Sequence, residues 1–326
     1  MKWKWQAEQM TKMSTVKTLI VLVLCFSLSA CKMLDVSDIS RFRESDDGKV
    51  SSSDGKSNVK RHETQPNMSS GEDYAKNDIS SSAQTNSDTQ IENIFSNNFS
   101  GCGGNVSYGY YNYSTGENFI KNSRKMKSAS VIKLFIMEYA YSLMEKEEIS
   151  SDTQVSGAKL SSLIESMITI SDNNATNALI DYFTMDKLNA YFAENGYNDT
   201  TIGRRMLDFD AQKAGKDNFT SVNDVMKFLN KLYANKGNKY SDDMLSVMSR
   251  QKVSTKIRRN MPTDVKICNK TGELSDVEND AGIVFTQNGD FAVVFIVNST
   301  DTYNVQNAIA KTTRQLYDKI ITPVVR

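Results

Sequence analysis

The chain has 326 residues, and its 39 basic and 39 acidic side chains give a formal net charge of zero at pH 7. Because no basic face stands out in the sequence, nucleic acid is not an expected partner. The segment at residues 91–326 is long enough for one large domain or two closely joined subdomains, which we expect to act as a monomer.

An apolar run near the N-terminus has the features of an export signal. Lys17 precedes residues 19–26, which are apolar but too few to span a bilayer. The sequence Leu-Ser-Ala stands directly before Cys31, and small residues before a cysteine resemble the processing site of bacterial lipoproteins. The alternative is an ordinary secretory signal with small residues at its cleavage point. We predict a signal peptide at residues 1–31 and an exported protein, anchored to the bacterial membrane by a lipid on Cys31.

The next segment, residues 32–90, is rich in Ser, Asp, Asn and Lys, and Phe42 and Tyr74 are its only aromatic residues. Such a composition buries too little apolar surface to offset the entropy lost on ordering. We therefore predict a disordered tether that holds the following domain away from the membrane. The alternative is low-complexity sequence without a selected length.

Hydrophobic periodicity predicts strands near both ends of residues 91–326 and helices between them. The pair Asn288-Gly289 is a strong hairpin turn signal. The strands from both ends are expected to meet in one antiparallel sheet flanked by helices, with an all-helical insertion, which is an α/β (α+β) fold. The expected helices are 91–97, 130–146, 160–169, 175–183, 185–194, 221–233, 241–250 and 305–320, and the expected strands are 105–113, 118–120, 266–270, 282–286 and 291–298.

The pair Ser130 and Lys133 stands at the start of a predicted buried helix. Residues three apart share a helix face, so the lysine amine is expected near the serine hydroxyl. A lysine in apolar surroundings loses its proton more easily, and a neutral amine is a base that can activate a serine nucleophile. Matches to this four-residue pattern by chance are common, so further motifs are needed.

Two such motifs follow: Ser171-Asp172-Asn173 between two helical patterns, and Lys270-Thr271-Gly272 after a short predicted strand. With the Ser130–Lys133 pair they stand in the chain order of the penicillin-recognising serine enzymes. Residues 91–326 therefore resemble the class A β-lactamases and related serine hydrolases, which implies a β-lactamase/transpeptidase-like fold. The only histidine, His62, lies in the predicted tether, which excludes a Ser-His-Asp triad within the domain.

The resemblance implies a catalytic role for four side chains. Ser130 would be the nucleophile, Lys133 its activating base, and Ser171 the relay that passes a proton to the departing nitrogen. Lys270 would keep Lys133 deprotonated by repulsion between like charges. The alternative for Ser171 is a helix cap, and the alternative for Lys270 is a solvated strand end.

The resemblance also implies a substrate-binding set. Asn173 would hold the side-chain amide of the substrate, and Thr271 would contact its carboxylate, next to Gly272. The backbone N–H groups of Ser130 and Glu273 would form the oxyanion hole, in which one donor is typically worth about 3–4 kcal/mol.

The loop at residues 201–210 departs from the β-lactamase pattern, in which a glutamate activates the water that releases the acyl group. Aligned on Arg204, the glutamate position holds Met206, which cannot accept a proton. Asp208 and Asp210 lie nearby as candidates for water activation, with shorter side chains in another register. The resemblance also implies that Arg204 pairs with Asp217 across the neck of the loop, as an Arg–Asp pair does in the family.

Two more departures concern the rim of the site. The interval from Ser130 to Ser171 is shorter than in typical β-lactamases, so a rim loop is trimmed. The residues after Gly272 are acidic, and the arginine that often grips the substrate carboxylate in β-lactamases is missing there.

These features predict an exported serine hydrolase that forms an acyl-enzyme with β-lactam amides or with D-Ala-D-Ala-like peptides of the peptidoglycan stem. Without the loop glutamate, we expect slow deacylation. The alternative is a lipoprotein that binds β-lactam or peptidoglycan and is acylated without useful turnover; a third reading is an inactive scaffold, against which the complete motif set argues.

The remaining cysteines, Cys102 and Cys268, are predicted to be separate buried thiols, with a disulfide as the alternative in an oxidising compartment. Neither has His or Cys clustered around it, so we expect no metal site and no cofactor.

Overall fold

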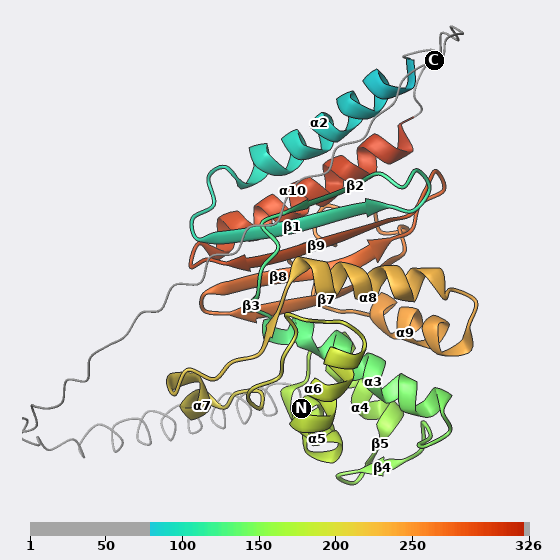
Figure 1. The fold of residues 1–326 in the computed structure, drawn as a ribbon, viewed down its shortest axis with the longest axis vertical. Coiled ribbons are helices and arrows are strands. Elements are labelled where there is room, and N and C mark those ends of the chain that lie inside the picture. Colours follow the sequence, from blue (N-terminus) through green and yellow to red (C-terminus); the bar gives the residue numbers. More distant parts are fainter. Residues whose placement is uncertain (1–78, 323–326) are drawn as a thin grey trace, which may run out of the picture. The chain divides into compact units, whose positions relative to one another are not determined.

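A computed structural model describes residues 79–322, with side chains from residue 89 onward (Figure 1). The predicted signal peptide, Cys31 and the tether as far as residue 78 lie outside the described residues. Within the part that is described, no helix is long and apolar enough to cross a membrane.

The core of the fold is a five-stranded antiparallel sheet with the strand order β2-β1-β9-β8-β7. Strand β1, from the start of the domain, pairs along its length with β9 from the end, so the sheet joins both ends as predicted. All but the last residue of β9 are buried, because helices cover both faces of the sheet. The strands are β1 (Asn105–Asn112), β2 (Asn118–Lys121), β7 (Ile267–Leu274), β8 (Val277–Val284) and β9 (Phe291–Asn298).

Two terminal helices, α2 (Ile79–Phe99) and α10 (Thr302–Ile321), cover one face of the sheet (Figure 1). Their apolar residues recur at helical spacing, and Ile91, Phe95 and Ile309 are fully buried in one cluster with the sheet. On the other face lie α8 (Val222–Ala234) and α9 (Lys239–Ser249), which connect the sheet to the helical insertion.

The helical insertion is built around α3 (Lys133–Glu145), whose apolar residues are buried on several sides. A 3₁₀ turn, η1 (Ala129–Ile132), leads into α3, so the predicted helix 130–146 is split at Lys133. The remaining helices of the insertion are α4 (Leu160–Thr169), α5 (Asn173–Phe183), α6 (Met185–Glu194) and α7 (Phe209–Lys213). Two short ladders accompany them: β3 (Met126–Lys127) with β6 (Phe219–Thr220), and β4 (Gln154–Val155) with β5 (Ala158–Lys159).

The structure differs from the prediction at the start of α2 and at the turn between β7 and β8. Helix α2 begins at Ile79, inside the segment assigned to the tether, because its first turns are polar and carry no apolar stripe that periodicity detects. Strand β7 extends to Leu274, past its predicted end at residue 270. Strand β8 begins at Val277, before its predicted start at residue 282. The acidic residues Glu278 and Asp280 interrupt the apolar pattern of β8, but both carboxylates are buried with partners.

Cys102 and Cys268 are free thiols, which confirms the prediction that they are separate. Cys268 is buried in β7 and donates to the carbonyl of Leu245 at 3.1 Å, whereas Cys102 is only half-buried, so the prediction of a buried thiol is wrong for Cys102.

Candidate active site

The turn that carries Ser130 is held by the sheet. Asn279 in β8 donates from Nδ2 to the carbonyls of Lys127 (2.9 Å) and Ser128 (3.0 Å), and its Oδ1 accepts from the N–H of Val297 at 2.8 Å. Ala129 has a φ of 44°, which is a costly conformation for a residue with a Cβ and persists only when its surroundings fix it. The central strands therefore hold the half-buried Ser130 in a defined position at the start of α3.

Three of the four predicted catalytic side chains form one hydrogen-bonded group. The amine of Lys133 lies 3.1 Å from Ser171 Oγ, and the amine of Lys270 lies 3.0 Å from the same oxygen. Lys133 also donates to the Ser171 carbonyl at 2.8 Å and to Asn173 Oδ1 at 2.9 Å. The two lysines, far apart in sequence, thus meet across the Ser171 hydroxyl, and Asn173 lies beside them.

Burial lowers the pKa of both lysine side chains, so each loses its proton more easily. The Lys133 side chain is buried, which lowers its pKa to about 7, while Asp172 raises it slightly. Burial also lowers the pKa of Lys270 well below its ordinary value, and the charge of Lys133 lowers it further. Two ammonium groups on one hydroxyl repel, so one protonated and one neutral lysine is the favoured state. The Ser171 hydroxyl oxygen accepts from both amines, and the Lys133 amine, once neutral, has a lone pair that can take up a proton.

Replacing Lys270 with alanine is expected to move the acid limb of the pH profile for acylation to higher pH. Lys133 is a base only when neutral, and a positive charge on Lys270, whose own pKa is lowered by burial and by the charge of Lys133, disfavours a proton on Lys133. Without Lys270, Lys133 holds its proton to higher pH. Measuring the acylation rate against pH checks this, with Lys270→Arg as the control that keeps the charge. If the acid limb of the pH profile does not move in the alanine variant, Lys270 does not lower the pKa of Lys133.

The Ser-Asp-Asn turn is fixed by Asp172. Its carboxylate accepts from the backbone N–H groups of Asn174 (2.7 Å) and Ala175 (3.0 Å) and so caps α5. Ser171, with a φ of 57°, lies outside the helix and points its hydroxyl at the two lysines. The alternative in which Ser171 caps the helix is therefore wrong, because Asp172 has that role. Lys270 is fully buried, so the solvated strand end is wrong as well.

Strand β7 approaches the Ser130 turn at Gly272. A Cβ at this position would lie 2.9 Å from the Ser128 carbonyl oxygen and 3.0 Å from the Ser130 nitrogen, so only glycine fits. This close contact brings the backbone of β7 alongside the N–H of Ser130. Thr271, whose carbonyl accepts from Lys270 at 2.8 Å, is buried beside it.

Lys256, a residue that the sequence did not reveal, places a positive charge beside the acidic residues of the hairpin formed by β7 and β8. Its side chain is 0% exposed, and its amine lies 2.5 Å from Glu273 and 2.8 Å from Glu278. Burial raises the pKa of the Glu273 carboxyl, but Lys256 outweighs this and brings it below its ordinary value. Lys256 comes from the loop between α9 and β7, where no local pattern marked it.

The predicted ion pair joins the two ends of the loop that contains α7. Arg204 Nε lies 2.8 Å from Asp217 Oδ1, and both side chains are buried, which confirms the pairing. Asp217 Oδ1 also accepts from the N–H of Asn218 at 2.8 Å.

Replacing Asp217 with alanine is expected to lower the free energy of unfolding by about 3–5 kcal/mol, because it leaves the Arg204 guanidinium buried without its counter-charge. Chemical denaturation monitored by fluorescence measures this. The double variant Arg204→Met/Asp217→Ala is the control, because it removes both charges and is expected to recover part of the loss. Equal losses in the single and double variants would contradict this explanation, because the unpaired Arg204 charge would then not be the cause of the lower stability.

Met206 occupies a defined position inside the same loop. Its backbone is held by the side chain of Asn177 in α5, which accepts from the Met206 N–H at 2.7 Å and donates to its carbonyl at 3.1 Å. The Met206 side chain is buried in the main core. Asn177 was missed in the sequence; its position one helical turn after Asn173 is the signal that would have found it.

The two aspartates proposed for water activation have other partners. Asp208 caps α7 by accepting from the N–H of Ala211 at 2.9 Å. Asp210 has a side chain 97% exposed and lies 3.7 Å from the amine of Lys213. Among the described residues, no hydrogen bond or ion pair joins either carboxylate to Lys133, Ser171 or Lys270. Their proposed role stays a prediction.

Comparisons with known proteins agree with this geometry. A family model described as the beta-lactamase enzyme family matches residues 86–320. A β-lactamase from Sphaerobacter thermophilus DSM 20745 is similar with a TM-score of 0.64 and 25% identity, covering 72% of this chain and 99% of that chain. PBP-A is similar in fold with a TM-score of 0.62 and 22% identity, covering 72% and 97%. A β-lactamase from Xanthomonas campestris pv. campestris str. ATCC 33913 has a TM-score of 0.65 at 16% identity, covering 72% and 98%. No curated protein matches the chain.

Proposed function

Because the chain belongs to the β-lactamase enzyme family and is a serine hydrolase that acts on amides, we propose that Ser130 forms an acyl-enzyme that is released slowly. The observation that carries the proposal is the pair Asn177 and Met206. Asn177 fixes the loop backbone, and the side chain at the fixed position is a buried thioether without a basic oxygen.

Acylation follows from the hydrogen-bonded group around Ser171. Ser130 Oγ attacks the carbonyl carbon of the amide, and its proton passes to the neutral amine of Lys133. The N–H of Ser130 and that of Glu273 stabilise the oxyanion. The amide C–N bond then breaks, and the departing nitrogen takes a proton from the Ser171 hydroxyl, which is replenished from the lysines that contact it.

The proposed substrates are β-lactam amides and the D-Ala-D-Ala-like peptides of the peptidoglycan stem. Support comes from a mutant of PBP-A that was solved as an acyl-enzyme complex with penicillin G. A second candidate is a lipoprotein that binds β-lactam or peptidoglycan and is acylated without useful turnover, which the missing basic oxygen at Met206 would also fit. The two candidates differ only in the rate of deacylation.

A rapid-mixing assay with a chromogenic cephalosporin tests the proposal, because it measures the acylation burst and the steady state in one trace. A turning-over enzyme releases many equivalents of product per site, whereas a binding protein stops after one. Absence of any burst and of any steady state contradicts both candidates.

We further propose that the protein is exported and works as a monomer tethered to the bacterial membrane by a lipid on Cys31. The sequence before Cys31 supports this location. Its substrates would then be reached outside the cytoplasm.

Replacing Cys31 with serine is expected to give an unprocessed or soluble protein in place of one that partitions into detergent, because the thiol that carries the lipid is removed. Detergent phase partitioning of whole-cell extracts measures this, with Cys25→Ser as the matched control. Detergent partitioning that survives the Cys31 substitution would rule out lipidation at this residue.

A further inference from the structure

The face of the β7–β8 hairpin that carries Thr271 is acidic. Side chains two residues apart on a strand share a face, so Glu273 follows Thr271 on this face, about 7 Å further along β7. In the register of the hairpin, Asp280 lies opposite Thr271 and Glu278 lies opposite Glu273. Three carboxyl groups therefore gather beside the threonine that is expected to contact the carboxylate of the substrate.

One buried lysine faces these three carboxyl groups. Lys256 is fully buried, and its amine lies 2.5 Å from Glu273 Oε1 and 2.8 Å from Glu278 Oε2. Asp280 is fully buried as well, and burial raises the pKa of its carboxyl. Even when Asp280 is protonated, two carboxylates share one ammonium group. The face that carries Thr271 thus has an excess of negative charge.

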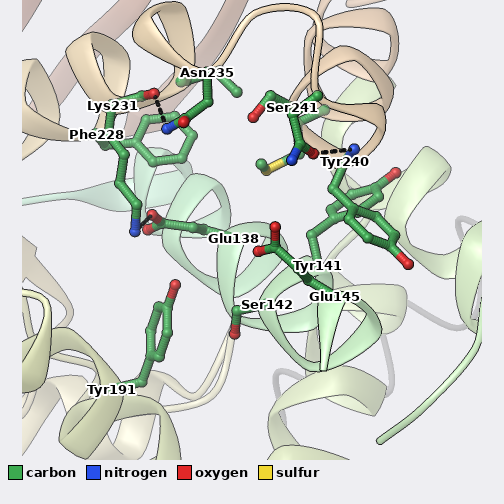
Figure 2. Close-up of a pocket in the computed structure, with 13 residues that line it drawn as sticks. Glu138, Tyr141, Ser142, Glu145, Tyr191, Phe228, Lys231, Asn235, Tyr240 and Ser241 are labelled. Carbon is green, nitrogen blue, oxygen red and sulfur yellow. Dashed lines mark hydrogen bonds and ion pairs between the residues drawn. The ribbon is translucent and has the colours of Figure 1, made fainter. Parts of the chain in front are cut away.

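Other buried acids of the molecule have one cation each. Glu138 of α3, which lines the pocket in Figure 2, has Lys231 at 2.8 Å. Arg204 and Asp217 likewise form a pair with one charge of each sign. On the hairpin one carboxylate is left over, and the more exposed of the two on Lys256 is Glu273, whose side chain is 45% exposed. The excess negative charge is therefore open to an incoming molecule at Glu273.

Glu273 also stands close to the nucleophile along the chain and in space. Its neighbour Gly272 touches the turn that carries Ser130, since a Cβ on Gly272 would lie 3.0 Å from the Ser130 nitrogen. The Glu273 carboxylate is held in place from below, because Lys256 and the Thr255 hydroxyl (3.3 Å) both donate to Oε1. An acyl donor that reaches Ser130 lies beside this fixed charge.

We propose that the Glu273 side chain is a specificity-determining residue, which disfavours acyl donors with a free carboxylate at Thr271 and favours those in which this group is neutral, such as a carboxamide. The inference rests on the proposed acyl-enzyme at Ser130 and adds the charge of the preferred substrate. Lys256 does not compensate for a second anion, because Glu273 and Glu278 already share its ammonium group. Repulsion between like charges about 7 Å apart at a partly exposed site is large enough to change a rate about tenfold.

The test compares benzylpenicillin with its carboxamide, in which a neutral amide of almost the same size replaces the carboxylate. Intact-mass spectrometry follows acylation of the full chain in detergent and gives the ratio of the two rate constants, carboxylate over carboxamide. Comparing this ratio between variants cancels the intrinsic reactivity of the two β-lactams. In Glu273→Gln, which keeps the backbone N–H and an oxygen for Lys256, the ratio is expected to rise about tenfold. An unchanged or lower ratio would overturn the proposal.

Asp276→Asn is the matched control. Asp276 lies in the turn of the same hairpin, and its carboxylate contacts the amine of Lys127 at 2.6 Å. Its replacement removes one negative charge from the hairpin without changing the face that carries Thr271, so the ratio is expected to stay the same. Equal rises in Asp276→Asn and Glu273→Gln would assign the effect to the overall charge of the hairpin and refute the role of Glu273.

Salt gives a readout on the unchanged protein that a merely structural role of Glu273 would not move. Raising the ionic strength from about 0.15 M to about 1 M shortens the Debye length from about 8 Å to about 3 Å. The carboxylate-to-carboxamide ratio is expected to rise several-fold in the unchanged protein and less in Glu273→Gln; a ratio independent of salt in the unchanged protein contradicts the repulsion. If neither probe acylates the protein, the acyl-enzyme itself is refuted. If both probes acylate it and the ratio ignores Glu273→Gln, the acyl-enzyme stands and the role of Glu273 falls.

Discussion

Replacing Ser130 with alanine is expected to abolish covalent labelling by penicillin and to leave the fold intact. The hydroxyl is the proposed nucleophile, and in the described structure it makes no hydrogen bond that the fold depends on. Intact-mass spectrometry should show one penicilloyl group on the unchanged protein and none on the variant. Peptide mapping should place the label on the peptide that contains Ser130.

The neighbouring Ser128 gives a matched control for this prediction. Ser128 is fully buried, and among the residues that the structure describes its hydroxyl bonds only to the carbonyl of Ala129, at 3.3 Å. Ser128→Ala should therefore keep the label, and thermal unfolding should show that both variants are folded. A label found on Ser128 or Ser171 would overturn the assignment of the nucleophile.

The unchanged enzyme is expected to give a burst of one equivalent of hydrolysed β-lactam, followed by a steady state about 10²–10⁴-fold slower than with a general base, a cost of about 3–5 kcal/mol in the barrier. The reason is that Met206 cannot deprotonate the water that attacks the acyl-enzyme. Stopped-flow absorbance with a chromogenic cephalosporin measures both phases. Mass spectrometry should find the acyl-enzyme still present long after the burst.

Substitutions at Met206 test the same point from the other side. Met206→Glu is expected to speed release, since Asn177 holds the backbone that would present the carboxylate. Met206→Gln has the same size without a carboxylate and should not speed it. Rapid steady-state hydrolysis by the unchanged protein, lost in Asp208→Ala or Asp210→Ala, would contradict the prediction and give an aspartate the role of the glutamate.

The sequence by itself determined the order of the elements and the identity of the chemical groups. Apolar spacing predicted β9 and the helices α4 and α6 at their observed bounds, because these segments bury a regular stripe that the local pattern records. The three motifs identified Ser130, Lys133, Ser171 and Lys270, and the resemblance to the class A β-lactamases implied the Arg204–Asp217 pair.

Only the tertiary structure decided which groups meet. Lys270 reaches Ser171 because β7 lies at the edge of the sheet that faces the insertion, and Lys256 reaches the acidic hairpin from a loop with no pattern of its own. Asn177 and Met206, likewise, are joined by two hydrogen bonds across the chain. Such contacts join residues distant in sequence, and their pKa shifts arise from burial. Periodicity reports the environment of a segment along the chain, whereas distance and desolvation are set by how the segments pack.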